Sequence, residues 1–153
     1  MIFHKKRNTR NGFTLIELLV VVAVIALLAT IMLGTLGSAR QQARDSKRLA
    51  DLKQLQTTLE LYANGNLGKY PTSLAVLVTG GLIPVVPPDP SGGAYSYAAL
   101  GAGANCSRYH LGATLEDTAH TALGLDFDAA AVAVCTGSAA DFAGTDPMYD
   151  LKP

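Results

Sequence analysis

The chain has 153 residues, of which 49% are hydrophobic and 16% charged, and its formal net charge is zero. This length allows one small domain plus one additional element. The charge balance gives no electrostatic footprint for nucleic acid, and without a phosphate loop, nucleophile elbow or HExxH motif we expect no enzyme.

Residues 1–12 form a basic leader with Lys5, Lys6, Arg7 and Arg10 and no acid. The remaining chain holds eight basic and twelve acidic residues, a net charge of −4. Positive residues stay on the cytoplasmic side of a membrane. The leader therefore predicts a cytoplasmic N-terminus, with the rest of the chain beyond the membrane.

An apolar segment follows, which we take as a membrane-spanning helix over residues 13–39. No charged residue lies between Leu18 and Ala39, about 22 positions or roughly 33 Å of helix, enough to cross a bilayer core. Glu17 stands at its entrance, and a carboxylate in hydrocarbon points to a function and a partner. A secretory signal peptide and an uncleaved anchor are alternatives, although the run exceeds the 7–15 apolar residues of a signal peptide.

Residues 40–64 predict an amphipathic stem helix. Leucines recur at helical spacing from Leu49 to Leu59, and Tyr62 continues the stripe, which we expect to pack on a head domain. Residues 64–66, Asn-Gly-Asn, tolerate left-handed backbone and predict the helix end. The stem is basic and the head acidic, which indicates either attraction between copies or ordinary solvated surfaces.

Residues 65–153 predict a globular α+β head. A short helix capped by Thr72 or Ser73 precedes three strands, at residues 95–100, 109–116 and around 130–135, while residues 117–128 and 137–153 read mainly as loops. In the second strand we expect the odd-numbered residues to face the stem helix. His110 and His120 are expected at the surface.

Two cysteines, Cys106 and Cys135, lie in the part expected outside the cytoplasm. We expect a disulfide there, with two unpaired core thiols as the alternative.

The N-terminal segment also carries a family resemblance. Residues 12–22, Gly-Phe-Thr-Leu-Ile-Glu-Leu-Leu-Val-Val-Val, resemble the cleavage and methylation motif of type IV pilins and pseudopilins. More loosely, Lys69-Tyr70-Pro71-Thr72 and Pro88-Asp89-Pro90 resemble the head of the major pseudopilin of type II secretion. The resemblance implies a pilin-like α+β fold with one long N-terminal helix packed on a small antiparallel sheet.

The resemblance further implies a structural subunit of a type IV pilus-like filament, either a type II secretion pseudopilus or a type IV pilus, with a minor tip subunit or membrane-anchored binding module as the alternative. It implies cleavage between Gly12 and Phe13 by prepilin peptidase, N-methylation of Phe13, and pairing of Glu17 with the Phe13 amine of a neighbouring subunit during self-assembly. Pairing of Glu17 with Phe13 of the same helix is the alternative that this spacing allows. The implied location is the inner membrane and then a periplasmic or extracellular filament, built by an assembly platform and an ATPase. Major pseudopilins bind calcium in a C-terminal loop, for which this sequence offers only weak candidates: Asp126, Asp128, Asp141, Asp146 and Asp150.

Overall fold

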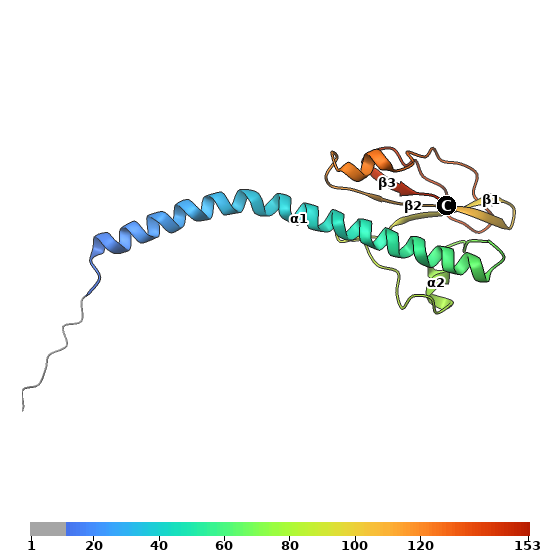
Figure 1. Ribbon diagram of the computed structural model, residues 1–153, viewed down its shortest axis with the longest axis horizontal. Helices are drawn as coiled ribbons and strands as arrows, with labels where there is room; N and C mark the ends of the chain where they lie inside the picture. Colours follow the sequence, from blue (N-terminus) through green and yellow to red (C-terminus); the bar gives the residue numbers. More distant parts are fainter. Residues whose placement is uncertain (1–11) are drawn as a thin grey trace, which may run out of the picture. The chain divides into compact units, whose positions relative to one another are not determined.

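The computed structural model describes residues 12–153, apart from the side chains of residues 33–35. The basic leader therefore lies outside the described residues, except for Gly12. The elements in chain order are α1 (Leu15–Gly65), α2 (Ala75–Thr79), β1 (Ser96–Ala102), β2 (Asn105–Thr114), the 3-10 helix η1 (Thr121–Leu125) and β3 (Met148–Leu151) (Figure 1). One long N-terminal helix and a small antiparallel sheet confirm the predicted α+β, pilin-like fold.

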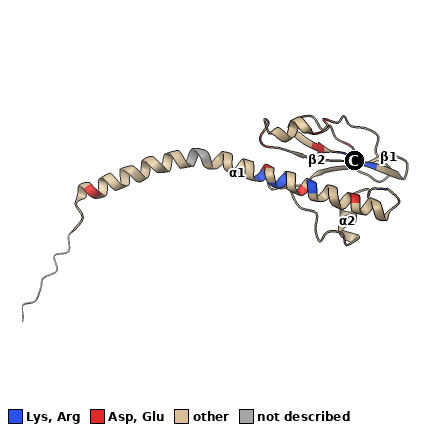
Figure 2. Ribbon diagram, in the orientation of Figure 1, with Lys and Arg blue, Asp and Glu red and all other residues tan. Residues whose placement is uncertain are grey.

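The chain divides into two compact units, Met1–Ala39 and Arg40–Pro153. In the first, α1 is apolar and exposed: Leu19 is 64% exposed and Leu27 65%. The helix is long and apolar enough to cross a membrane, judged by length and composition. Glu17 is the only charged residue between Leu15 and Ala39 (Figure 2). This surface needs an apolar environment that the first unit does not itself supply.

In the second unit, the later part of α1 forms the hydrophobic core with the sheet. Leu52, Leu55 and Leu59 are fully buried. They belong to one cluster with Tyr109 and with other sheet residues, namely Leu111 and Ala113 of β2 and Leu151 of β3. The predicted leucine stripe and the predicted inward face of the second strand are therefore correct.

The end of α1 differs in detail from the prediction. The helix ends at Gly65, and the left-handed residues are Leu67 (φ 59°) and Gly68 (φ 75°). The Gly68 N–H donates to the Ala63 carbonyl at 2.9 Å, and the Asn66 side chain donates to the Tyr62 carbonyl at 2.8 Å. The helix ends within the predicted Asn-Gly-Asn segment, these bonds satisfy its last carbonyls, and the left-handed residues lie just after that segment.

The sheet has the order β1-β2-β3, with antiparallel pairing throughout. The third strand was predicted wrongly: β3 lies at Met148–Leu151, in a segment expected to be loop, while near residue 134 the structure has only an isolated bridge from Val134 to Leu100. The expected side-chain cap of the short helix is also absent, because Leu74 precedes α2 without a side-chain cap.

Backbone groups on both outer edges of the sheet are hydrogen-bonded to the segment between β2 and β3. Along β1, the Ala99 N–H donates to the Ser138 hydroxyl at 2.8 Å, and the Ala99 carbonyl accepts from the Cys135 N–H at 3.0 Å. Along β3, the Asp150 N–H donates to the Asp126 carboxylate at 3.2 Å. The segments between the strands therefore take up backbone groups that an edge strand would otherwise expose.

Candidate functional site

Glu17 lies in the first turn of α1, where Thr14 holds its side chain. The Thr14 N–H and hydroxyl each donate to Glu17 Oε2 at 2.9 Å, and the Glu17 N–H donates to the Thr14 hydroxyl at 3.3 Å. This is a capping box, which satisfies N–H groups left over at a helix start. The carboxylate is thus fixed at the entrance of the apolar segment.

The residues around Glu17 are open. Phe13 is 86% exposed and Ile16 70%, and Gly12 is exposed and precedes the helix. The peptide bond between Gly12 and Phe13 therefore lies outside regular secondary structure, one helical turn from Glu17.

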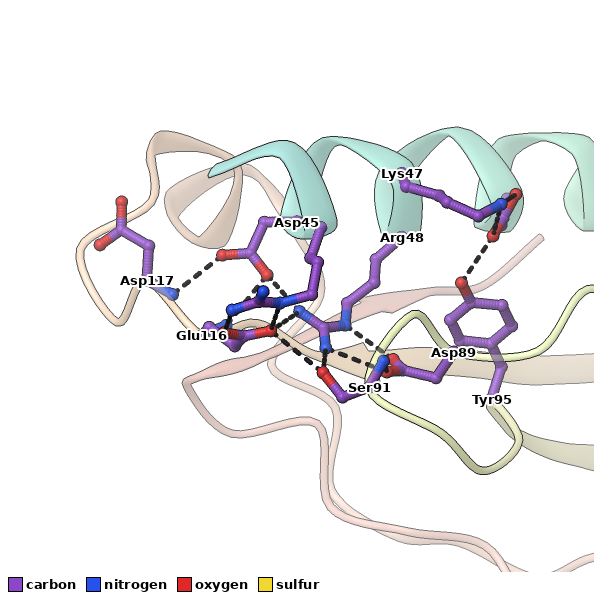
Figure 3. Close-up of polar contacts among 10 residues, drawn as sticks. Asp45, Lys47, Arg48, Asp89, Ser91, Tyr95, Glu116 and Asp117 are labelled. Carbon is purple, nitrogen blue, oxygen red and sulfur yellow. Dashed lines mark hydrogen bonds and ion pairs between the residues drawn. The ribbon is translucent and has the colours of Figure 1, made fainter. Parts of the chain in front are cut away.

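A second cluster of charges fastens α1 to the head, and we call it the arginine clamp (Figure 3). At its centre Arg48, only 2% exposed, donates to Asp45 at 2.6 Å and to Glu116 at 2.9 Å. Its other nitrogens donate to Asp89 at 2.6 and 3.0 Å. The clamp consists of Arg44, Asp45, Arg48, Asp89, Ser91 and Glu116.

Asp45 adds a backbone connection to the clamp. Its fully buried carboxylate accepts the N–H groups of Glu116 at 3.0 Å and Asp117 at 2.9 Å, at the end of β2. One turn of α1 therefore binds both the segment after β2 and the loop that carries Asp89. These stem charges pair with the head of the same chain. Neither attraction between copies nor a solvated surface is therefore needed to explain these particular charges.

The clamp also changes the acidity of its members. The Arg44 guanidinium, followed by Arg48 and Ser91, lowers the pKa of Glu116 to about 2. Arg48 lowers the pKa of Asp89 against the opposing effect of burial. Both carboxylates are therefore ionised well below neutral pH, as paired carboxylates usually are.

Three of the five acidic candidates for calcium come together. Asp126, Asp128 and Asp146 place carboxylate oxygens within 4.8 Å of one another, and we call them the acidic cluster. Asp126 is half-buried, whereas Asp128 and Asp146 are exposed. Calcium prefers six to eight oxygen ligands, drawn from carboxylates, backbone carbonyls and water.

The surroundings of Asp126 meet one requirement of a cation site. Its Oδ1 is buried without a hydrogen-bond partner among the described residues. Burial raises the pKa of Asp126, and the charges of Asp150 and Asp128 raise it further. A divalent cation would pair the orphaned oxygen and offset this repulsion, so the donor set fits calcium.

The other two candidates, Asp141 and Asp150, bind His110 instead. The His110 ring nitrogens lie 2.7 Å from Asp141 Oδ1 and 2.7 Å from Asp150 Oδ2. His110 is fully buried, so its predicted surface position is wrong. The segment after β2 folds back over the outer face of the sheet, where Phe142 stacks on the imidazole with ring centroids 3.8 Å apart.

The two cysteines form a disulfide between Cys106 at the start of β2 and Cys135. Both are buried and pack with Ala99 of β1. The bond therefore ties the segment after η1 to the sheet. His120 lies at the start of η1, where its Nδ1 accepts the Ala122 N–H at 3.1 Å.

Comparison with known proteins adds a family to this geometry. The model of the prokaryotic N-terminal methylation motif matches residues 7–33, which include Gly12, Phe13 and Glu17. Type II secretion system core protein G of Vibrio cholerae is 32% identical over 124 residues, covering 71% of this chain and 84% of the relative. The protein of the same name from Pseudomonas aeruginosa is also 32% identical over 124 residues, covering 71% and 87%.

A pilus protein is related as well. The type IV wide pilus major component PilA4 of Thermus thermophilus is 41% identical over 76 residues, covering 50% of this chain and 56% of the relative. No solved structure gives a significant match. With its methylation motif, its long apolar helix and relatives matched over most of their length, the chain belongs to the type II secretion core protein G family, within the superfamily of type IV pilins and pseudopilins.

Proposed function

We propose that this chain is a structural subunit of a type IV pilus-like filament, and that the filament is the pseudopilus of type II secretion. The observation that carries the proposal is the apolar surface of α1, which the described chain leaves uncovered, with one carboxylate in its first turn. Lipid covers such a surface in the stored subunit. The same surface of other copies covers it in a filament, so the exchange keeps apolar side chains in apolar surroundings.

The choice of the pseudopilus rests on the extent of the resemblance. The match to core protein G covers 71% of the chain, more residues than lie between Met1 and the end of α1, so it includes part of the head. The match to PilA4 covers half of the chain. The names "core protein" and "major component" favour a main building unit over a minor tip subunit, the alternative function.

Processing prepares the subunit for assembly. Prepilin peptidase cleaves between Gly12 and Phe13, and the new Phe13 amine is methylated. Before cleavage, Thr14 supplies two donors to Glu17, so the carboxylate is already partly satisfied. After cleavage, the cationic amine of a neighbouring subunit binds Glu17 and sets the axial position of the new copy.

The proposed filament function also implies the remaining partners: the inner membrane, an assembly platform with its ATPase, and calcium. The subunit crosses the inner membrane once, with the basic leader cytoplasmic and residues 40–153 outside. A membrane assembly platform and a cytoplasmic ATPase lift it into the filament. Asp126, Asp128 and Asp146 would hold a calcium ion, which would pair the buried oxygen of Asp126.

The N-terminus of the mature protein tests the proposed function directly. Mass spectrometry of the chain isolated from sheared filaments or membranes is expected to find Phe13 as the first residue, with one methyl group on its amine. A mature chain that begins near Arg40 would mean ordinary signal cleavage and would rule out the filament subunit. Copy number distinguishes a main subunit from a tip subunit, because a main subunit dominates sheared preparations.

A further inference from the structure

Three exposed apolar side chains lie within eight residues of the head, at positions 125–132, which we call the apolar loop. Leu125 is 86% exposed, Phe127 58% and Val132 45%. They are half of the large hydrophobic side chains that residues 40–153 expose, the others being Leu61, Leu67 and Val85. One exposed hydrophobic side chain is ordinary, whereas a group of them marks a contact surface.

The head holds the apolar loop in one conformation. The Asp150 carboxylate accepts the N–H groups of Phe127, Asp128 and Ala129 at 3.1, 3.0 and 3.2 Å. Directly after Phe127, Asp128 has a left-handed backbone (φ 43°), which an L-residue adopts only at a cost. Phe127 is therefore presented to the exterior in a fixed position, which reduces the entropy lost when a partner covers it.

The apolar loop and α1 lie on opposite faces of the sheet (Figure 1). Tyr109 and Leu111 of β2 pack in the core with α1. His110, between them, points to the other face because side chains alternate along a strand, and there it contacts Asp150. Since Asp150 also binds the apolar loop, the loop lies across the sheet from α1.

Beyond residue 39, α1 has an exposed side that faces away from the sheet, which we call the outer stem face. Six exposed residues recur there at alternating spacings of four and three, which places them on one side of a helix. They are Ala43, Lys47, Ala50, Gln54, Thr57 and Leu61. The alanines leave room on this face for a large side chain of another molecule.

The two surfaces have opposite charge. The exposed charged residues of α1 beyond residue 39 are three cations and one anion, namely Arg40, Lys47, Lys53 and Glu60. The apolar loop contains two members of the acidic cluster, and no lysine or arginine lies between residues 109 and 151. The three acids of the cluster keep one negative charge even with Ca²⁺ bound. Opposite charges steer two such surfaces together and align them.

We propose that the apolar loop of one copy docks on the outer stem face of a second copy, with Phe127 packed over Ala50 and the acids of the loop facing Lys47. The inference rests on the proposed filament function and deepens it, because it names the surfaces that join the heads. A copy that uses one face of its head still offers the opposite face to the next copy. Such a head-to-tail contact repeats into an open helical filament rather than a closed pair.

Cross-linking of sheared filaments tests the contact without altering Phe127 or Ala50. Ala130→Cys in the apolar loop is combined with Gln54→Cys on the outer stem face. A flexible bis-maleimide reacts only with these thiols, because the native cysteines are joined to each other. We expect a ladder of dimers and larger multimers on a reducing gel. Each single variant should stay monomeric, as should the pair of Ala130→Cys with Gln42→Cys, which is exposed on another side of α1.

Substitutions in the two surfaces test their contribution to assembly. Ala50→Glu adds bulk and a negative charge to the outer stem face, and Phe127→Ser removes the aromatic ring. We expect each to lower the yield of sheared filaments about tenfold or more, as for truncation at the centre of an interface. Gln42→Glu makes the same charge change as Ala50→Glu, and Leu67→Ser removes another exposed apolar side chain. Both controls should keep the wild-type yield.

The outcomes separate the docking contact from the filament function beneath it. Wild-type filaments without a ladder in the Ala130→Cys and Gln54→Cys pair would overturn the contact and leave the filament function standing. Wild-type yield from both Ala50→Glu and Phe127→Ser would do the same. A wild type that forms no filament under any condition of expression would overturn the proposed function and the contact together. The melting temperature of each full-length variant in detergent should equal that of the wild type, so that a loss of yield reports assembly.

Discussion

At the scale of single residues, Thr14 and Glu17 illustrate how a charge is kept at the edge of an apolar segment. The spacing Thr-x-x-Glu is readable from the sequence as a capping box, and the structure forms it. The box uses one carboxylate oxygen, Oε2, for both bonds from Thr14. The other oxygen, Oε1, takes no part in these two bonds, and in the proposed filament it would accept the amine of an incoming subunit.

Substitution of Glu17 separates the cap from the charge. Glu17→Ala should be cleaved normally but should give little filament. Glu17→Gln keeps an oxygen for the Thr14 bonds and loses the ion pair, so it should also assemble poorly. Immunoblots report cleavage, and sheared-filament yield reports assembly. Wild-type yield from Glu17→Gln would show that the cap suffices and would remove the ion pair from the scheme.

Asp126 gives a second prediction at this scale. Burial raises the pKa of its carboxyl, so its ionisation at neutral pH opposes folding. Asp126→Asn should therefore raise the melting temperature in EDTA and abolish the additional stabilisation by Ca²⁺. Differential scanning fluorimetry in EDTA and in CaCl₂ measures both effects. Asp117→Asn, outside the acidic cluster, is the matched control and should keep the Ca²⁺ response.

At the scale of elements, the arginine clamp joins α1 to two segments that are far away in sequence. Arg48 forms salt bridges with Asp89 and Glu116, which lie 41 and 68 residues further along the chain. The stability that the clamp supplies depends on ionised carboxylates. It belongs to the folded state alone, because the unfolded chain separates these residues.

The lowered pKa of Glu116 predicts the pH range in which this stability is lost. The pKa is about 2 in the folded chain, against the ordinary 4.5. The contribution is therefore complete above pH 4.5 and disappears as the pH falls towards 2. Urea unfolding at pH 7 and pH 3 should show a smaller loss for Glu116→Gln than for the wild type. The same loss in both would exclude Glu116 as a source of the acid sensitivity, and Asp117→Asn should behave like the wild type.

Elements set by local pattern were predictable, whereas those set by distant partners were not. The leucine stripe and the alternation of β2 follow from sequence period alone, and both are correct. β3 was missed because Met-Tyr-Asp-Leu places an acid inside a four-residue strand. Asp150 is stable there only because His110 and three backbone N–H groups surround it. The clamp and the buried His110 were hidden for the same reason, since their partners come from other parts of the chain.

At the scale of the whole molecule, the chain combines an exposed apolar helix with a head that has its own core. The core cluster contains residues of α1 from Leu52 onward and residues of the sheet. The clamp and the disulfide also lie between Arg40 and Pro153. The second unit therefore holds all of these stabilising contacts without help from residues 12–39.

Residues 40–153, secreted to an oxidising compartment, should therefore form a folded, soluble monomer. The apolar segment that demands lipid or other copies is gone, while the core, clamp and disulfide remain. Circular dichroism and size-exclusion chromatography check folding and size. In this background Leu55→Ala should cost about 2–5 kcal/mol of stability, and the exposed Leu61→Ala much less. An aggregated or unfolded product would mean that the head needs the first unit.

The hydrogen-bonded edges of the sheet have a consequence for how heads can meet in such a filament. Assembly crowds many copies of one head together, and identical open strands at that density would join by backbone pairing and form an irreversible aggregate. Here Ser138 and Cys135 occupy backbone groups of β1, and Asp126 occupies one of β3. These bonds remove part of the backbone pairing that neighbouring heads could otherwise make, and they favour contacts between heads through side chains.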